Sequence, residues 1–189
     1  MTLILASNSP RRRELLAGLG LDFEVRVLPG IDESYPVELS EGDIPLYISR
    51  AKAAAYLPTL AADELLITAD TIVWLDGQVL EKPHDEADAQ RMLRQLSGKT
   101  HQVFTGVCLT TTDKQVAFSC RTDVTFCSLT DDEIQHYVSH YHPLDKAGAY
   151  AVQEWIGYVG VEHIEGSFFN VVGLPVQRLY QALKQNFKI

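Results

Sequence analysis

The chain has 189 residues, of which 46% are hydrophobic and 22% are charged, and this is the ordinary composition of a globular protein. With only three cysteines, the composition excludes a disulfide scaffold as well as collagen-like and disordered chains. The formal net charge of −9 argues against general binding to nucleic acid or to a membrane surface, because both reward basic patches. We therefore expect a single domain over residues 1–189 that has neither kind of partner.

No apolar run in the sequence approaches the roughly 20 residues that a membrane span needs. The apolar residues 3–6 are soon followed by Pro10 and three arginines, which is the wrong order of apolar and charged residues for a secretory signal. Cys108, Cys120 and Cys127 form no CxxC pair and are typical of reduced thiols. Together these features predict a cytoplasmic protein.

The first third of the chain alternates between apolar runs and turn residues. Ser9 is a suitable N-cap, and Pro10 fits the first position of a helix, where its missing N–H is not needed. The elements expected here are, in chain order, a strand over 2–6, a helix from Pro10 that ends at Gly18 or Gly20, a strand over 23–28, a loop over 29–39 and a helix over 43–57.

Two hairpins are predicted in the middle of the chain. Asp76-Gly77 is a strong signal for a two-residue hairpin turn, and Thr130 with Glu133 has the pattern of a capping box that opens a helix. Hairpins mixed with helices predict a mixed α/β fold and not a purely parallel, doubly wound sheet. The elements expected here are a strand over 65–69, a hairpin of 72–75 and 78–80, a helix over 85–96, a hairpin of 103–112 and 116–126, a helix from Thr130 to Ser139, a glycine-rich and strand-like segment over 145–173, and a last helix opened by Pro175.

Basic and small polar residues meet at the start of the first predicted helix, in the segment Ser7-Asn8-Ser9-Pro10-Arg11-Arg12-Arg13. Cations at a helix N-terminus are unfavourable unless an anion binds there as well, and arginine matches the geometry of phosphate oxygens. The segment is therefore either a phosphate site or an ordinary solvated basic turn.

Carboxylates and lysines follow in several loops and at one strand end. Asp70 ends an apolar strand, where it either holds a cation or a water molecule or merely caps a turn. Lys82, in Glu81-Lys82-Pro83, is either a phosphate ligand or half of a surface ion pair. Glu33 lies in an acidic loop and Lys52 in a predicted helix, and neither is distinctive alone.

Two motifs imitate functional sites. Ser97-Gly98-Lys99-Thr100 resembles the end of a P-loop, but the first glycine is missing and the motif ends a helix instead of opening one. We predict a helix C-cap, with Gly98 in the left-handed turn and Lys99 near the last carbonyls. His136 and His140 have metal-ligand spacing without the glutamate of HExxH, so an exposed helix end is favoured over a zinc site.

Segments 145–153 and 166–175 are rich in glycine and alanine, which lets backbone approach backbone or a ligand closely. Gln153 ends the first segment, and its amide both donates and accepts, so it can read the edge of a base. The alternative is a tightly packed connection within the sheet.

Each signal is modest, but their order and spacing from residue 3 to residue 183 resemble the Maf family of nucleoside triphosphate pyrophosphatases, earlier named septum-formation inhibitors. The motifs that carry the resemblance are Ala6-Ser7-x-Ser9-Pro10-Arg11-Arg12, Thr68-Ala69-Asp70-Thr71, Glu81-Lys82-Pro83, Ser97-Gly98-Lys99-Thr100-His101, Thr105-Gly106-Val107, Asp145-Lys146-Ala147-Gly148-Ala149-Tyr150, and Gly166-Ser167 with Asn170-Val171-Val172-Gly173-Leu174-Pro175.

The resemblance implies a mixed α/β fold related to that of the inosine triphosphate pyrophosphatases. In that fold an elongated, curved sheet is flanked by helices, and two lobes surround a cleft. The resemblance also implies that a nucleoside triphosphate and water give the monophosphate and pyrophosphate, with a divalent cation such as Mg²⁺ or Mn²⁺. A homodimer is compatible with the family.

Residue roles follow from the matching motifs. The resemblance makes Asp70 the general base or metal-organising carboxylate and makes Glu33 its acidic partner around the metal. The phosphate contacts that it implies are Ser7, Arg11, Arg12, Lys52 and Lys82.

The branch of the family that acts on dTTP and UTP is the most similar, and modified pyrimidine nucleotides also fall within the family's range. Arg12, Thr71 and Gln153 are the positions that mark this branch. The chain departs from the branch after Gln153, where Glu154-Trp155 replaces a frequent glycine and is expected beside the base pocket.

Two other functions are compatible with the sequence. The older family name suggests a non-enzymatic, nucleotide-sensing regulator of septation or cell division, which would bind nucleotide without turnover. A nucleic-acid binder that uses the arginines at 11–13 is disfavoured by the net charge.

Overall fold

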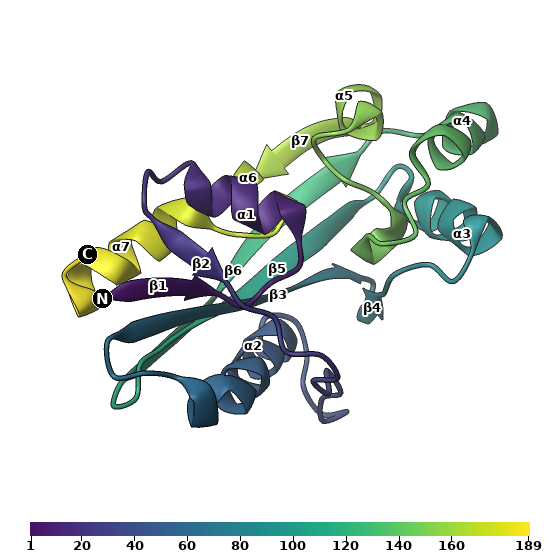
Figure 1. Ribbon diagram of the computed structural model, residues 1–189. Helices are drawn as coiled ribbons and strands as arrows, with labels where there is room; N and C mark the ends of the chain where they lie inside the picture. The colour runs from purple at the N-terminus through teal and green to yellow at the C-terminus, as the bar shows by residue number, and fades with distance from the viewer. The chain divides into compact units, whose positions relative to one another are not determined.

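A mixed β-sheet of seven strands runs through the computed structural model, which describes all 189 residues (Figure 1). The strands are β1 (Thr2–Leu5), β2 (Phe23–Val25), β3 (Glu64–Leu75), β4 (Gln78–Leu80), β5 (Thr100–Thr110), β6 (Gln115–Phe126) and β7 (Val161–Glu165). Their order is β2-β1-β3-β5-β6-β7, and β4 pairs with β3. β1 is parallel to β2 and β3, whereas β4 and β7 are antiparallel to their neighbours. The predicted mixed α/β class is confirmed.

Seven α-helices complete the fold: α1 (Pro10–Ala17), α2 (Asp43–Tyr56), α3 (Glu86–Leu96), α4 (Asp131–Tyr141), α5 (Trp155–Gly160), α6 (Phe168–Val172) and α7 (Val176–Phe187). Short 3-10 turns occur at Leu57–Thr59 and Ala147–Ala149. None of the helices has the length and apolar character that a membrane crossing requires.

The chain divides into two compact units, each with a core of its own. Unit 1 comprises residues 1–70, 105–120 and 173–189, and unit 2 comprises residues 71–104 and 121–172. The division falls within strands β3, β5 and β6. The single domain and the cleft that the sequence led us to expect stay predictions.

Helices cover both faces of the sheet in unit 1 (Figure 1). Leu5 of β1 packs with Leu16 of α1 and Leu179 of α7, whereas the adjacent Ile4 packs with Ala53 of α2. Successive side chains of a strand point to opposite faces, so a strand that is covered on both sides is apolar throughout. This explains the uninterrupted apolar run at residues 3–6.

The core of unit 2 lies where α3 and α4 pack against the sheet. Leu93 of α3 and Ile134 of α4 are buried together with Val124 and Phe126 of β6. Full burial of such side chains is worth about 1.5–3 kcal/mol each. The apolar faces of both helices are therefore the faces that build the core of this unit.

Local sequence signals predicted several element ends correctly. The side chain of Ser9 accepts a hydrogen bond from the backbone N–H of Arg12, and α1 ends at Gly18. Thr130 and Glu133 form the predicted capping box at the start of α4. Asp76 and Gly77 have φ of 51° and 82°, as a tight hairpin turn of the primed type requires.

Three expected elements differ from the structure. β3 is one continuous strand instead of two, and β2 is shorter than the predicted 23–28. The segment 145–173 is mostly turns and short helices, with β7 as its only strand. Its glycines serve tight packing: a Cβ at Gly148, where φ is +67°, would lie 3.0 Å from methyl carbons of Val73.

Both imitating motifs make local contacts within the fold. Gly98 has a φ of 69° just after α3, which confirms the predicted C-cap. Lys99 lies near the last carbonyls, since its N–H donates to the carbonyl oxygen of Leu96 at 3.1 Å, and its ammonium donates to Asp76 at 2.7 Å. The rings of His136 and His140 lie 4.2 Å apart between centroids, and no group of three or more His, Cys, Asp or Glu residues is arranged to hold a metal ion.

An ion pair between the end of β2 and the start of β3 gives unit 1 a pH dependence. Arg26 donates to both carboxylate oxygens of Glu64, at 2.9 and 2.6 Å, and this bonding lowers the pKa of Glu64 from 4.5 to about 2. A carboxyl group with a depressed folded-state pKa stabilises the fold above its unfolded-state pKa, and this contribution is lost as the pH falls. Between pH 4.5 and 2 we expect the urea midpoint of the wild type to fall more steeply than that of Glu64→Gln. The exposed Glu38→Gln is the control and should follow the wild type. If the urea midpoints of the wild type and Glu64→Gln fall equally with pH, the Arg26–Glu64 ion pair is not the cause of the pH dependence.

Candidate active site

A lysine between two carboxylates forms the centre of a polar cluster in unit 1. The Nζ atom of Lys52 lies 2.9 Å from Oε1 of Glu33 and 2.9 Å from Oδ1 of Asp70. The side chains of Lys52 and Asp70 are only 12% and 13% exposed, whereas that of Glu33 is 58% exposed. The structure therefore brings together three predicted site residues, and one of the carboxylates remains open to solvent.

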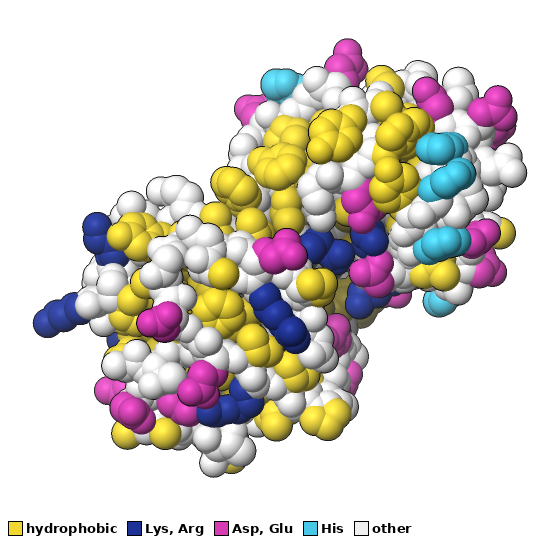
Figure 2. Space-filling view, turned by 45° about the horizontal axis from the view of Figure 1, so that its top comes forward, with side chains coloured by type: hydrophobic (Ala, Val, Ile, Leu, Met, Phe, Trp, Pro, Cys, Tyr) yellow, Lys and Arg dark blue, Asp and Glu magenta, His cyan; other side chains and the backbone are white.

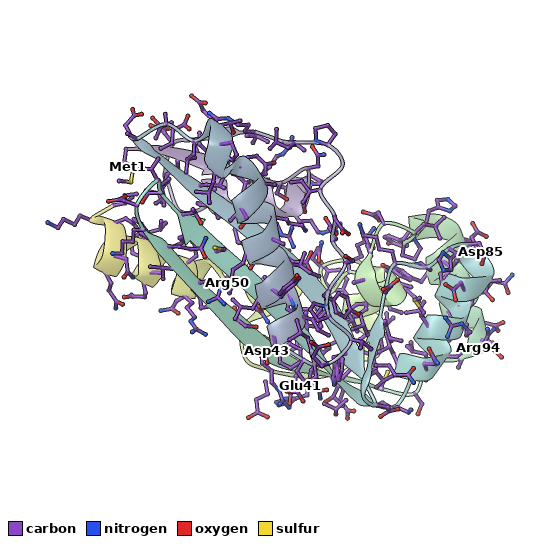
Figure 3. The ribbon with its side chains drawn as sticks, turned by 90° about the horizontal axis from the view of Figure 1, so that it is seen from below. Met1, Glu41, Asp43, Arg50, Asp85 and Arg94 are labelled. Carbon is purple, nitrogen blue, oxygen red and sulfur yellow. The ribbon has the colours of Figure 1, made fainter.

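Three elements supply this cluster. Asp70 lies on β3 where the buried run of residues 65–69 ends, Lys52 lies on α2, and Glu33 lies in the loop between β2 and α2. Figure 3 shows α2 lying along the strands of unit 1, with Asp43 at its start and Arg50 further along. The position of Lys52 thus depends on how closely α2 approaches the sheet.

Two contacts that sequence reasoning missed fix α2 against the sheet. The buried hydroxyl of Thr68 donates to the carbonyl oxygen of Ser49 at 2.7 Å, one helical turn before Lys52. Gly106 of β5 lies so close to α2 that a Cβ there would be 2.3 Å from the carbonyl carbon of Pro45. Both residues lie in the motifs that carry the family resemblance, but a motif does not say which backbone it contacts.

Arg12 connects the first turn of α1 to β3, at the end of the buried run of that strand. Its Nε atom donates to the carbonyl oxygen of Gly173 at 2.9 Å, and its Nη1 atom donates to that of Ala69 at 3.0 Å. Burial lowers the pKa of the guanidinium, and the nearby Asp70 opposes this effect. The cation is therefore held beside the carboxylate by backbone contacts.

The turn before α1 folds back on itself. The buried Ser7 accepts a hydrogen bond through Oγ from the N–H of Ser9 at 3.2 Å. Arg13 donates to the carbonyl oxygen of Ser7 at 3.5 Å, and Arg11 is half-buried at the same helix end. Pro10 has no N–H, and the N–H groups of Arg12 and Arg13 donate to the side chain and the carbonyl oxygen of Ser9, so this end offers an anion its arginine side chains.

The other three predicted site residues belong to unit 2. Thr71 is half-buried on β3, and Lys82 is exposed just after β4. The side-chain oxygen of Gln153 is buried and accepts no hydrogen bond from the chain. Because a buried acceptor without a donor is costly, this atom points to a donor that is supplied from outside the chain.

Glu33 and Asp70 are the carboxylates of the unit 1 cluster that a divalent metal ion would use. Mg²⁺ is usually held by one or two carboxylates together with waters and substrate phosphates. Two carboxylates without a third protein ligand fit a metal ion of this kind and not a closed protein cage.

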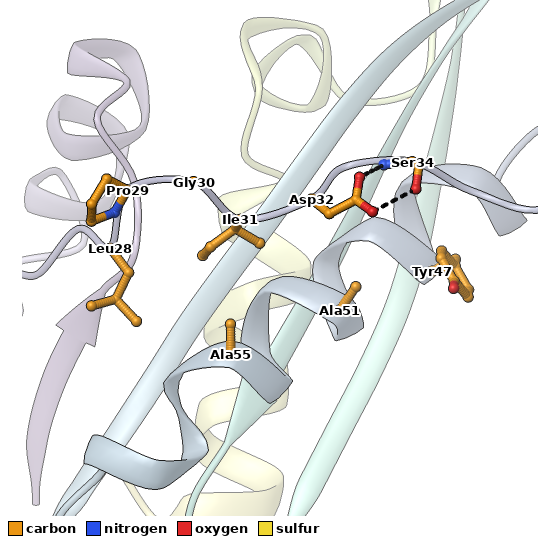
Figure 4. A pocket seen from close by; sticks show the side chains of 9 residues that line it. All are labelled: Leu28, Pro29, Gly30, Ile31, Asp32, Ser34, Tyr47, Ala51 and Ala55. Atoms are coloured by element: carbon orange, nitrogen blue, oxygen red, sulfur yellow. Dashed lines mark hydrogen bonds between the residues drawn. The ribbon is translucent and has the colours of Figure 1, made fainter.

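A groove of about 590 Å³ lies between residues 28–34 and α2 in unit 1 (Figure 4). Its carboxylate, Asp32, accepts hydrogen bonds from the N–H and the hydroxyl of Ser34, both at 2.9 Å. A groove of this size takes a small ligand, but no lysine or arginine lines it. It therefore lacks the cations that a triphosphate needs.

A family model described as "Maf-like protein" matches residues 2–186 of the chain. The chain belongs to the Maf family. Two relatives of this Maf chain are each named "dTTP/UTP pyrophosphatase". The protein from Phocaeicola vulgatus is 63% identical over 97% of this chain and 95% of its own, and that from Bacteroides thetaiotaomicron is 62% identical with the same coverage. A solved HAM1 protein from Coxiella burnetii is 14% identical, with a TM-score of 0.49 over 98% of this chain and 100% of its own.

Proposed function

We propose that this Maf protein hydrolyses dTTP and UTP to the monophosphate and pyrophosphate. The observation that carries the proposal is the ion cluster of Asp70, Lys52 and Glu33 at the end of a buried strand run. It occurs in a chain whose relatives at 48% to 63% identity bear the name of this activity. Those names do not favour a non-enzymatic regulator.

The reaction requires a base for the attacking water, cations for the phosphates and a stabilised leaving group. Asp70 accepts the proton of the water whose oxygen bonds to the α-phosphorus, and the bond from that phosphorus to the bridging oxygen breaks to release pyrophosphate. The ammonium of Lys52, 2.9 Å away, orients the carboxylate of Asp70.

Cations are needed to neutralise the phosphate charge. We assign phosphate oxygens to Arg11, Arg12, Lys52 and Lys82, with the hydroxyl of Ser7 as a further donor. A divalent metal ion, Mg²⁺ or Mn²⁺, held by Asp70 and Glu33 would neutralise phosphate charge and orient the substrate.

The amide oxygen of Gln153, which is buried without a donor, favours a substrate base that presents an N–H group to it. Thymine and uracil present an N3–H beside a carbonyl oxygen, which matches the acceptor and donor of one amide. Cytosine presents an acceptor at N3 beside a donor at N4, so it matches the amide only in the opposite orientation, and an amide held in one orientation discriminates against it. Arg12 and Thr71 are the other positions that we assign to substrate choice.

Replacing Gln153 tests the base assignment. In Gln153→Ala we expect kcat/KM for dTTP and UTP to fall by about tenfold to a hundredfold, because one matched pair of hydrogen bonds is lost. Turnover of CTP changes little, so discrimination between the pyrimidines falls. The measurement is pyrophosphate release with dTTP, UTP, CTP, GTP and ATP, with the exposed Gln181→Ala as control. Unchanged discrimination in Gln153→Ala would refute the role of this amide.

Partners and location stay predictions. The face seen in Figure 2 intersperses basic and acidic side chains instead of presenting a continuous basic surface, which supports the expectation of no nucleic-acid partner. A homodimer, a cytoplasmic location and the absence of a membrane partner remain expectations from the sequence.

A further inference from the structure

A second ion cluster lies in unit 2, next to Gln153 in the chain but outside the residues that the proposed reaction uses. The Nζ atom of Lys146 lies 2.9 Å from Oδ1 of Asp145 and 3.4 Å from Oε1 of Glu154. The Lys146 side chain is only 9% exposed. A charge buried to this degree requires its partners, so Glu154 is held in place from one side by Lys146.

Tyr137 of α4 holds both ends of the turn that carries Gln153. Its buried hydroxyl donates to Oε2 of Glu154 at 2.5 Å and accepts from the N–H of Ala151 at 3.1 Å. The turn is also closed by its own backbone, since the N–H of Glu154 donates to the carbonyl oxygen of Ala151 at 3.0 Å. Burial and the neighbouring Glu154 raise the pKa of Tyr137, which keeps its hydroxyl protonated as a donor.

The side chains of Glu154 and Trp155 contact the body of unit 2. The sequence led us to expect this pair beside the base pocket. Glu154 contacts Tyr137 and Lys146, and the Trp155 ring packs on His136 with 4.7 Å between centroids; the place of the pair relative to the base stays a prediction. Between these anchored neighbours and Ala151, the side-chain oxygen of Gln153 is buried without a donor.

We propose that Tyr137, Glu154 and Lys146 are positioning residues that fix the amide of Gln153 for reading the base. The proposal rests on the proposed function, in which Gln153 contacts the pyrimidine. A group that must match two hydrogen bonds works only when its own supports hold it in the productive geometry. Glu154, where the branch often has glycine, thus acts as a brace for its neighbour and not as a contact to the base.

The test compares Tyr137→Phe with Tyr141→Phe, because both remove one hydroxyl from the same helix. Tyr141 stacks on Tyr137 with 5.0 Å between centroids, but its hydroxyl makes none of the contacts described above. Gln153→Ala and the double variant Tyr137→Phe/Gln153→Ala complete the set. Two quantities are measured for each full-length protein: hydrogen exchange of the amides at 151–154, and kcat and KM for dTTP, UTP and CTP.

In Tyr137→Phe we expect the amides at 151–154 to exchange about tenfold faster. We also expect KM for dTTP and UTP to rise by about tenfold with kcat nearly unchanged, because base binding weakens while the reacting groups stay in place. Discrimination against CTP falls, and Tyr141→Phe shows none of these changes. In the Gln153→Ala background, adding Tyr137→Phe leaves discrimination unaltered, because coupled residues are not additive.

Discrimination that survives in Tyr137→Phe, unchanged exchange at 151–154, or additive losses in the double variant would each overturn the positioning role. If Gln153→Ala loses discrimination and Tyr137→Phe does not, only the positioning role fails. If the wild type leaves dTTP and UTP intact, the proposed function fails and the positioning role fails with it.

Discussion

Asp70→Asn is expected to lower kcat for dTTP by about 10²- to 10⁴-fold, which is the usual contribution of a positioned general base. The amide has nearly the shape of the carboxylate but cannot take the proton of the attacking water. The fold survives, because Asn still offers an oxygen to the ammonium of Lys52 and Glu33 still lies 2.9 Å from that ammonium. The measurement is pyrophosphate release at saturating dTTP and Mg²⁺, with circular dichroism to verify the fold.

Asp76→Asn is the matched control for this variant. Asp76 lies in the β3–β4 hairpin turn and pairs with the exposed Lys99 at 2.7 Å, and we assign it no role in the reaction. Its turnover should equal that of the wild type. Turnover near the wild-type level in Asp70→Asn, or an equal loss in both variants, contradicts the role of Asp70 as base.

Gly106→Ala is expected to lower the stability of the fold strongly. The new Cβ would lie 2.3 Å from both the carbonyl carbon and the oxygen of Pro45 and 2.4 Å from the nitrogen of Leu46. These are backbone atoms of the first turn of α2, so no change of rotamer relieves the clash. Overpacking usually costs about 1–3 kcal/mol, and we expect the upper end of this range because a whole helix must move.

Thermal unfolding measures this loss, which corresponds to a fall in Tm of about 6–12 °C for about 3 kcal/mol in a chain of this size. Activity falls as well, since α2 carries Lys52 away from Asp70. Gly18→Ala is the control, because its φ is −61° and its Cβ would make only an ordinary contact of 3.4 Å with the Leu15 oxygen. Equal Tm values for the two variants would show that α2 is not pressed against β5 at this point.

Local chemistry explains what the sequence could predict. The Ser9 cap, the Asp76-Gly77 turn and the Thr130 capping box each depend on residues within four positions of one another. The place of Asp70 at the end of an apolar run left a turn cap and a site residue open, and it was the family resemblance that assigned its role. Such signals need no knowledge of which elements pack together.

Tertiary contacts decide what the sequence left open. Glu33 and Lys52 were not distinctive by themselves, and only the packing of α2 on the sheet brings them to Asp70. Arg12 donates to the carbonyl oxygen of Gly173, which is 161 positions away. Backbone partners at such distances leave no periodic pattern in the sequence.

The segment 145–173 was the weakest prediction for the same reason. Its glycines and alanines carry no amphipathic pattern, and the strand-like character expected for it was wrong outside β7. Its shape depends on partners from other elements, such as the hydroxyl of Tyr137, which binds the N–H of Ala151. Nothing in the sequence connects Glu154 to Tyr137 or Trp155 to His136, and the structure shows both contacts.

Isotope labelling tests the proposed reaction most directly. The wild-type protein is incubated with dTTP and Mg²⁺ in water enriched in ¹⁸O, and the masses of the separated products are measured. Attack of water on the α-phosphorus predicts that the label appears in dTMP and that the pyrophosphate stays unlabelled. Label in pyrophosphate, release of orthophosphate, or tight binding of dTTP without turnover would contradict the proposed pyrophosphatase.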